Sequence, residues 1–235
     1  MSRPVLVLWD LDLTLLDPAG FGTRMITPAL AGFLGRDPVM GASFAGRTDR
    51  AILTDLLERN GMERPDDEVV TRLMDAVAER CEAFGRDLLD AGGGALPGAH
   101  DAVAALASDE RLHQGIVTGN MRRTALLKLG LCGFDGLPDP ALGAFGDHHV
   151  DRAHLVRDAV VTARARGLDV SASHAVVVGD HVHDVRGALD AGARCVAVAT
   201  GRVSAGRLHA AGAHAVLPDL TDSDALLAAI RTAAH

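Results

Sequence analysis

Two acidic motifs that lie far apart in the chain have residues that could do chemistry together. In the first, Asp10 and Asp12 are two residues apart and directly follow the apolar run 5–9. Two carboxylates this close repel each other unless a cation or a proton lies between them. The pair therefore indicates a divalent metal site or acid–base chemistry, although an ordinary aspartate turn after a strand has the same pattern.

The second acidic motif occupies residues 179–184, in which Asp180 and Asp184 are four residues apart. Such a pair suits Mg²⁺, which proteins hold with few oxygen ligands plus water and phosphate. His181 and His183 also raise a zinc hypothesis, but no third nitrogen or sulfur ligand has suitable spacing. We therefore expect the two histidines to face solvent or substrate.

A polar tripeptide, Thr118-Gly119-Asn120, stands between these motifs at the start of a helical pattern over 121–129. A hydroxyl together with free backbone N–H groups at a helix N-terminus forms an anion site. A threonine N-cap would give the same local sequence.

Short apolar runs predict the strands that position these residues. Each run is apolar on both faces, which is typical of strands in a parallel sheet with helices on both sides. The stripes 155–163 and 185–189 predict helices between strands, so we expect a doubly wound, Rossmann-like α/β fold. Ligands bind at the carboxyl ends of such strands, where three of the runs meet polar residues. The runs are 5–9, 115–117, 175–178 and 195–199.

One interval is too long for this alternation. About a hundred residues separate the first two predicted strands, whereas a parallel crossover needs only about a dozen. Apolar stripes over 52–57 and 70–88 have the spacing of amphipathic helices. We therefore expect residues 17–95 to form an inserted α-helical cap domain that works as a lid, with 1–16 and 96–235 forming the core.

The composition excludes several functions. The chain has 235 residues, a formal net charge of −8, 48% hydrophobic and 3% aromatic residues, which argues against disorder and nucleic-acid binding. No apolar run approaches the ~18 residues of a transmembrane helix, and the N-terminus does not read as a signal peptide. Its three cysteines are far apart. We expect reduced thiols in a cytoplasmic protein that is a monomer or homodimer.

Together, the three polar motifs closely resemble those of the haloacid dehalogenase-like (HAD) hydrolase superfamily, in order and in placement at strand ends. The resemblance extends over essentially the whole chain, and the phosphoglycolate-phosphatase-like branch, with a helical cap after the first motif, fits best. The matching motifs are Asp10-x-Asp12-x-Thr14, Val117-Thr118-Gly119-Asn120 and Val178-Gly179-Asp180-x-x-x-Asp184.

The resemblance implies a Mg²⁺-dependent phosphatase that acts on a small phosphate ester. Asp10 would be the nucleophile that forms an aspartyl-phosphate, and Asp12 the general acid and base with its backbone carbonyl on the metal. Asp10 and Asp180 would bind Mg²⁺, and Asp184 would bind it or anchor the other ligands. The phosphoryl oxygens would be held by Thr118, Gly119 and Asn120.

In the family, a lysine or arginine normally lies on or just before the helix that precedes the third motif, residues 178–184. This chain departs from the usual pattern because it has no lysine there. Arg152, at the start of the helix over 155–163, is our choice for balancing the carboxylates and the phosphate. Lys128 is the alternative, although its position two turns into a helix is more typical of a surface residue. In the cap, the resemblance implies that Arg47 contacts the substrate.

Other functions stay open. A sugar phosphomutase would use the same fold and residues. A 2-haloacid dehalogenase needs neither a metal nor a general acid for the leaving group of a phosphate ester. Asp12, Asp180 and Asp184 therefore argue against this function. A non-catalytic regulator is disfavoured because crowded like charges destabilise a fold unless they serve a function.

Overall fold

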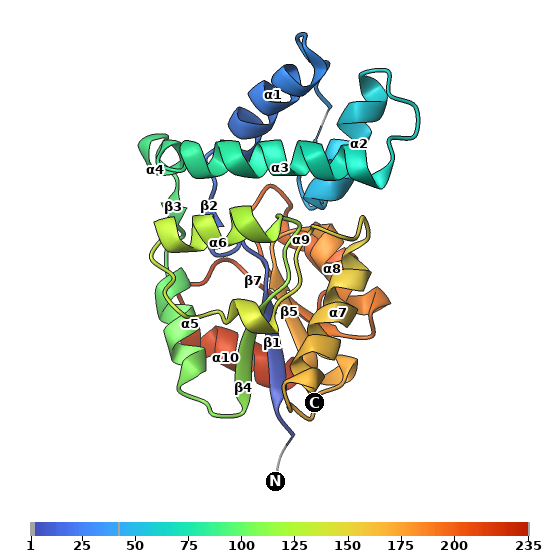
Figure 1. Ribbon diagram of the computed structural model, residues 1–235. Coiled ribbons are helices and arrows are strands. Elements are labelled where there is room, and N and C mark those ends of the chain that lie inside the picture. Colours follow the sequence, from blue (N-terminus) through green and yellow to red (C-terminus); the bar gives the residue numbers. More distant parts are fainter. Residues whose placement is uncertain (1–2, 42, 235) are drawn as a thin grey trace.

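A computed structural model describes residues 3–41 and 43–234 (Figure 1). Residues 1, 2, 42 and 235 belong to the predicted core and cap ranges but lie outside the described residues. The centre of the fold is a parallel sheet in the order β4-β1-β5-β6-β7. Its strands are β1 (Val5–Trp9), β4 (Leu112–Ile116), β5 (Ala175–Gly179), β6 (Arg194–Val198) and β7 (Ala215–Leu217).

Helices cover both faces of this sheet, because alternate strand residues point to opposite sides. Val7 and Trp9 belong to a core formed with α5 (Ala99–Ala107) and α10 (Ser223–Ala233). Leu6 and Leu8 belong to a second core on the other face. The helices of that second face are α7 (Arg152–Ala165), α8 (Val182–Asp190) and α9 (Ala205–Ala210). The doubly wound α/β fold expected from the sequence is therefore confirmed.

The second predicted strand begins earlier than its apolar run. β4 starts at Leu112, whereas the sequence pattern indicated residues 115–117. The polar Gln114 interrupts the run, yet it is buried, because its side chain accepts a hydrogen bond from Trp9 Nε1 at 2.9 Å and donates to Val103 O at 2.9 Å. The short edge strand β7 was not predicted.

A layer of helices lies beyond the carboxyl ends of the strands (Figure 1). The strands β2 (Leu16–Asp17) and β3 (Gly94–Ala95) pair antiparallel and hold together the two connections between this layer and the sheet. We refer to this group as the helical layer: α1 (Phe21–Leu34), α2 (Asp49–Arg59), α3 (Asp67–Ala83) and α4 (Asp87–Asp90).

The apolar stripe over 70–88 is not one helix. α3 ends at Ala83, with Phe84 as its C-cap, and Leu88 belongs to the separate turn of α4. α1 was not assigned from the sequence and has Pro28 in its interior.

One more helix, α6 (Arg122–Leu131), follows β4 and lies against α3 at the boundary with the helical layer (Figure 1). It begins one residue later than the pattern over 121–129 indicated, because Met121 is its N-cap. Two short 3₁₀ turns complete the described elements, Pro140–Leu142 and Ala172–His174. Within residues 3–41 and 43–234, no helix combines the length and hydropathy that a membrane crossing requires.

Candidate active site

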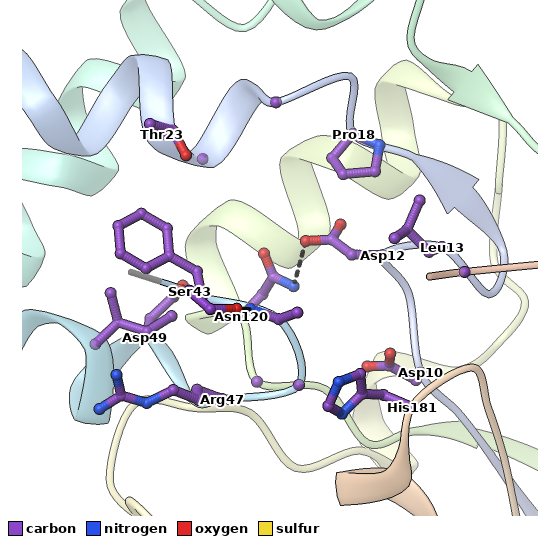
Figure 2. A pocket seen from close by; sticks show the side chains of 18 of the residues that line it. Asp10, Asp12, Leu13, Pro18, Thr23, Ser43, Arg47, Asp49, Asn120 and His181 are labelled. Carbon is purple, nitrogen blue, oxygen red and sulfur yellow. Dashed lines mark hydrogen bonds between the residues drawn. The ribbon is translucent and has the colours of Figure 1, made fainter. Parts of the chain in front are cut away.

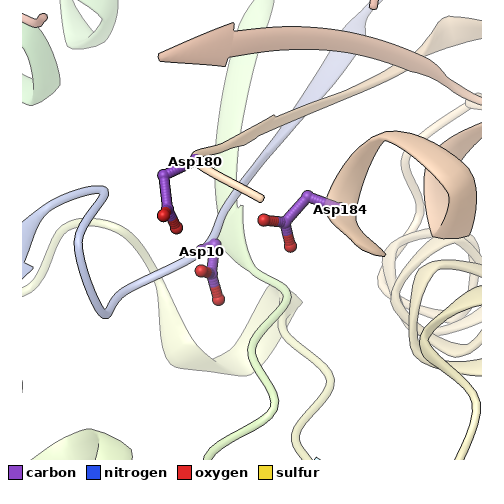
Figure 3. Close-up of side chains that lie close together, drawn as sticks. All are labelled: Asp10, Asp180 and Asp184. Atoms are coloured by element: carbon purple, nitrogen blue, oxygen red, sulfur yellow. The ribbon is translucent and has the colours of Figure 1, made fainter. Parts of the chain in front are cut away.

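Three buried carboxylates meet at the carboxyl ends of β1 and β5 (Figure 3). Asp10 follows β1, Asp180 follows β5, and Asp184 lies in the first turn of α8. One oxygen from each lies within 4.8 Å of the others. The adjacency of β1 and β5 in the sheet thus brings together residues that are some 170 positions apart (10 and 180).

Arg152 joins this cluster from the start of α7. Its Nη2 lies 3.0 Å from Asp10 Oδ1 and also contacts Asp184 Oδ1, and the side chain is buried. Asp151, the N-cap of α7, accepts a hydrogen bond from the N–H of Ala153 at 2.9 Å and so fixes the start of the helix. The single guanidinium is therefore shared between two carboxylates.

Burial and mutual repulsion act on all three acids. Burial, followed by the charge of Asp184, raises the pKa of Asp10 to about 7 against the lowering effect of Arg152. Burial and the charges of Asp184 and Asp10 raise the pKa of Asp180 to about 8. Burial also raises the pKa of Asp184. Arg152 alone does not offset this density of negative charge, so the cluster favours an additional cation.

The donor set fits a hard divalent cation. All three groups offer carboxylate oxygens, the ligands that such cations prefer. Asp184 Oδ2 accepts the backbone N–H of His181 at 2.9 Å, but Oδ1 is buried against Arg152 without a hydrogen bond of good geometry. In the described part of the chain, no histidine or cysteine joins a cluster of three or more candidate metal ligands, which argues against the zinc hypothesis.

A second charged group lies around Asp12. Lys128 Nζ donates to both Asp12 oxygens at 2.8 and 2.7 Å and to Asn120 Oδ1 at 2.6 Å. Asn120 Nδ2 donates to Asp12 Oδ2 at 3.2 Å. Lys128 is only 1% exposed, so the expectation of a surface residue was wrong. The helical pattern could not show this burial, because the contacts of Lys128 with Asp12 and Asn120 and the packing of α3 against α6 are long-range.

The N-terminus of α6 does not offer the free N–H groups that the sequence suggested. The N–H of Met121 donates to Asp49 Oδ2 at 2.8 Å, and that of Arg122 donates to Asp147 Oδ2 at 2.9 Å. Neither acid was assigned a role from the sequence. Asp49 is the first residue of α2, after the N-cap Thr48, and this position was the available signal.

Within the tripeptide 118–120, Thr118 Oγ1 accepts hydrogen bonds from the backbone N–H of Asn120 at 3.3 Å and from Asn120 Nδ2 at 3.1 Å. Thr118 is fully buried. Gly119 and Asn120 line the neighbouring cavity. In this tripeptide, therefore, Thr118 shapes the loop, and the other two residues face the space above the carboxylates.

A cavity of about 670 Å³ separates the carboxylates from the helical layer (Figure 2). Asp10, Asp12 and Asp180 line one side of it, together with Lys128 and Arg152. The helical layer and the loop between α1 and α2 contribute a largely apolar wall, including Ile26, Met40, Phe44, Ile52 and Val77. The space is large enough for a small organic molecule next to the charged groups.

Arg47 lines the cavity from the loop before α2, but its guanidinium is turned away from Asp10 (Figure 2). Nη2 donates to Ala51 O at 3.0 Å and Nη1 lies 3.6 Å from Asp55. Arg47 is thus not brought together with the acidic cluster.

The two histidines lie at the start of α8. His181 lines the cavity and accepts the N–H of His183 at 3.2 Å through Nδ1, and the two rings stack at 4.8 Å. Burial, then the charge of His183, lowers the pKa of His181 to about 4. His181 is therefore neutral near pH 7, and with Nδ1 as acceptor its Nε2 carries the proton.

The comparison with family models supports the sequence resemblance. Residues 154–223 match the model described as HAD-hydrolase-like. No curated protein matches the chain in sequence.

Solved structures share the fold over nearly the whole length. A predicted phosphatase from Clostridium acetobutylicum has a TM-score of 0.71 at 22% identity, covering 97% of this chain and 100% of that one. A Bacteroides vulgatus protein provisionally described as a beta-phosphoglucomutase has a TM-score of 0.71 at 19% identity, covering 98% and 90%. CbbY from Rhodobacter sphaeroides, solved in complex with phosphate, has a TM-score of 0.70 at 20% identity, covering 94% and 96%.

Proposed function

From its place among the haloacid dehalogenase-like hydrolases, we propose that this chain is a Mg²⁺-dependent phosphatase of a small phosphomonoester. Hydrolysis would proceed through an aspartyl-phosphate on Asp10. The observation that carries the proposal is the meeting of Asp10, Asp180 and Asp184 within 4.8 Å beneath a cavity of about 670 Å³.

The charges around the site support a divalent ion. Within residues 3–41 and 43–234, the ion-pair partners of the four acids Asp10, Asp12, Asp180 and Asp184 are two cations, Arg152 and Lys128. Full ionisation of the four acids therefore leaves two negative charges in excess. Asp10, Asp180 and Asp184 would hold the ion by their side chains, and Asp12 by its backbone carbonyl. Mg²⁺ supplies charge neutralisation for a phosphoryl group next to the carboxylates.

Asp10 is the nucleophile in this proposal. It lies at the end of a rigid buried strand, and its Oδ1 is held by Arg152 at 3.0 Å. The free oxygen of its carboxylate would attack phosphorus while the ester oxygen leaves. Arg152 would keep the nucleophile oriented and would offset charge on the phosphoryl group.

Asp12 is the general acid and base. Its carboxyl group is one-third exposed, at 33%, and faces the cavity, while Lys128 and Asn120 hold its two oxygens. It would give a proton to the leaving alcohol and would then take one from the water that hydrolyses the aspartyl-phosphate. Gly119 and Asn120, shaped by Thr118, would hold the phosphoryl oxygens.

The cap segment, residues 17–95, would close over the substrate. Its apolar wall would contact the organic part of the ester, and Arg47 would contact the substrate after turning from Asp55. We further propose that the protein is cytoplasmic and acts as a monomer or homodimer, as expected from the sequence.

The test is a panel of phosphorylated metabolites and p-nitrophenyl phosphate with Mg²⁺, scored for inorganic phosphate. We expect release from at least one ester, lost in Asp10→Asn and on chelation of the metal. Hydrolysis that survives in Asp10→Asn would contradict the proposal. Isomerisation of a sugar phosphate without phosphate release would identify a phosphomutase instead.

A further inference from the structure

We propose that Asp49 is a positioning residue that couples the cap segment to the phosphate-binding loop 118–120. Its carboxylate caps α6 from the cap segment, so that docking of the cap segment adds to the core contacts that hold the loop in place. The inference deepens the proposed function and rests on it for the role of the loop.

The first observation concerns the N-terminus of α6. Its N-cap is Met121, which has no side-chain oxygen to accept a backbone N–H. Two carboxylates from distant segments take that place: Asp49 Oδ2 accepts the N–H of Met121 at 2.8 Å and Asp147 Oδ2 accepts that of Arg122 at 2.9 Å. A negative charge at this end of a helix also interacts favourably with the helix dipole.

Asp49 makes a second hydrogen bond to the same loop, in which it is the donor. Its backbone N–H donates to Gly119 O at 2.7 Å. This is available because Asp49 is the first residue of α2, where the N–H group has no partner within the helix. One residue of the cap segment therefore holds the loop from both sides of Asn120.

The neighbouring residue extends the contact. The backbone N–H of Arg50 donates to Gly146 O at 3.3 Å, and Arg50 Nε donates to Asp147 O at 2.6 Å. Gly146 in turn donates its N–H to Asn120 O at 2.8 Å. Three segments, 49–50, 119–121 and 146–147, thus form one hydrogen-bonded seam between the cap segment and the core.

The seam also depends on the absence of side chains. A methyl group added at Gly119 would collide with the carbonyl oxygen of Arg47, and one at Gly146 would collide with the carbonyl oxygen of Gly119. Glycine at both positions lets the backbones approach closely enough for these bonds to form.

The seam is connected to two groups that the proposed mechanism needs. Asn120 lies within the seam. Lys128, the partner of Asp12, lies on α6, which begins at the edge of the seam. Movement of the cap segment away from the core would break the Asp49 and Arg50 bonds together. The loop and the start of α6 would then keep only the core bonds from Gly146 and Asp147 among the contacts of the seam. Docking of the cap segment would restore these bonds. Asp49 is therefore the residue through which the docked cap segment acts on the loop.

Three variants test this assignment. Asp49→Ala removes the acceptor, whereas Asp49→Asn keeps an oxygen that can accept the Met121 N–H. Asp147→Ala is the matched control, because it removes an equivalent bond to the same helix end but from within the core. Each variant is compared with the wild type by hydrogen exchange of the ligand-free protein and by KM and kcat on the best ester of the panel.

We expect Asp49→Ala to lower kcat/KM about tenfold, the size of one lost capping bond, with a raised KM because substrate must order the loop. Asp49→Asn should stay within about threefold of the wild type, since the acceptor is kept. Asp147→Ala should lower thermal stability while KM stays that of the wild type. Loss of folded protein alone would lower apparent kcat and leave KM unchanged.

Hydrogen exchange decides the coupling independently of activity. In Asp49→Ala, amides of residues 43–52 and 119–122 should exchange faster together, whereas in Asp147→Ala the increase should be confined to the start of α6. Equal effects of Asp49→Ala and Asp147→Ala, or unchanged exchange in 43–52, would overturn the inference. If no ester is hydrolysed but the exchange pattern holds, the proposed function fails and the coupling stands.

Discussion

Without the proposed divalent ion, the stability of this protein should depend on pH in a defined direction. Asp10 and Asp180 have pKa values raised from 3.8 to about 7 and about 8 by burial and by neighbouring carboxylates. The folded state therefore binds their protons more tightly than the unfolded state does. The stability that protonation contributes is fully present below about pH 4 and is lost as pH rises through about 7 to 8.

The window from about pH 6.5 to pH 8.5 spans the titration of these two acids. Asp49, with a pKa of about 6, completes most of its titration below it. His181, with its pKa lowered to about 4, takes up a proton on unfolding near pH 6.5 and so offsets part of the fall at the lower edge. In this window the folded state holds protons on the two carboxyls that the unfolded state has already released. This difference in bound protons, integrated over the window, amounts to about 2 pH units, which lowers the free energy of unfolding by about 3 kcal/mol. For a chain of this length such a loss lowers Tm by about 5 to 10 °C.

The assay is thermal unfolding in chelator and in saturating Mg²⁺ at both pH values. With chelator, Tm should fall by that amount between the two; with Mg²⁺, which favours the ionised carboxylates, the fall should largely disappear. Asp180→Asn is the control, because its amide does not titrate, and the fall should shrink to less than half. Equal stability of the metal-free protein at both pH values, with no effect of Mg²⁺, would refute the shared carboxylate site.

Two further substitutions act on single contacts. Lys128→Met should lower kcat about a hundredfold, because the Asp12 oxygens lose their buried ammonium partner. It should lower the free energy of unfolding by only about 2 kcal/mol, because the Asp12 side chain is one-third exposed and water can solvate it. Activity assays and urea unfolding measure the two effects, and unchanged kcat would contradict the role of this lysine. Gly201→Ala should weaken Mg²⁺ binding about tenfold or more, since an added methyl group would collide with Asp180 Oδ2. Calorimetric titration with Mg²⁺ measures this affinity, and an unchanged affinity would contradict the role of Asp180 as a ligand.

The acidic site was predictable because its residues sit at the ends of strands that are buried on both faces. Runs such as 5–9 and 175–178 have no polar residue, so their ends are sharp and the polar motifs follow directly. Parallel strands then bring those ends to one edge of the sheet. β4 was placed less well because Gln114 satisfies its polar groups inside the core, a pairing with Trp9 that no local pattern reveals.

Contacts between the helical layer and the core were beyond the sequence pattern. Lys128 has the spacing of a surface residue on α6, yet its ammonium is buried against Asp12 and Asn120, and α3 packs against the same helix. Asp49 is a normal first-turn acid of α2, and its bond to Met121 depends on how two distant segments meet. Such contacts depend on long-range docking, which a single sequence does not encode in any local period.

The most direct test of the proposed chemistry is to trap the covalent intermediate. The enzyme would be mixed with its best ester and Mg²⁺, quenched in acid within one turnover, digested and analysed by mass spectrometry, with Asp10→Asn treated in parallel. A phosphoryl group on the peptide that carries Asp10, absent from the variant, is the expected result. Full turnover with no phosphorylated peptide, or with the phosphoryl group on a residue other than Asp10, would contradict it.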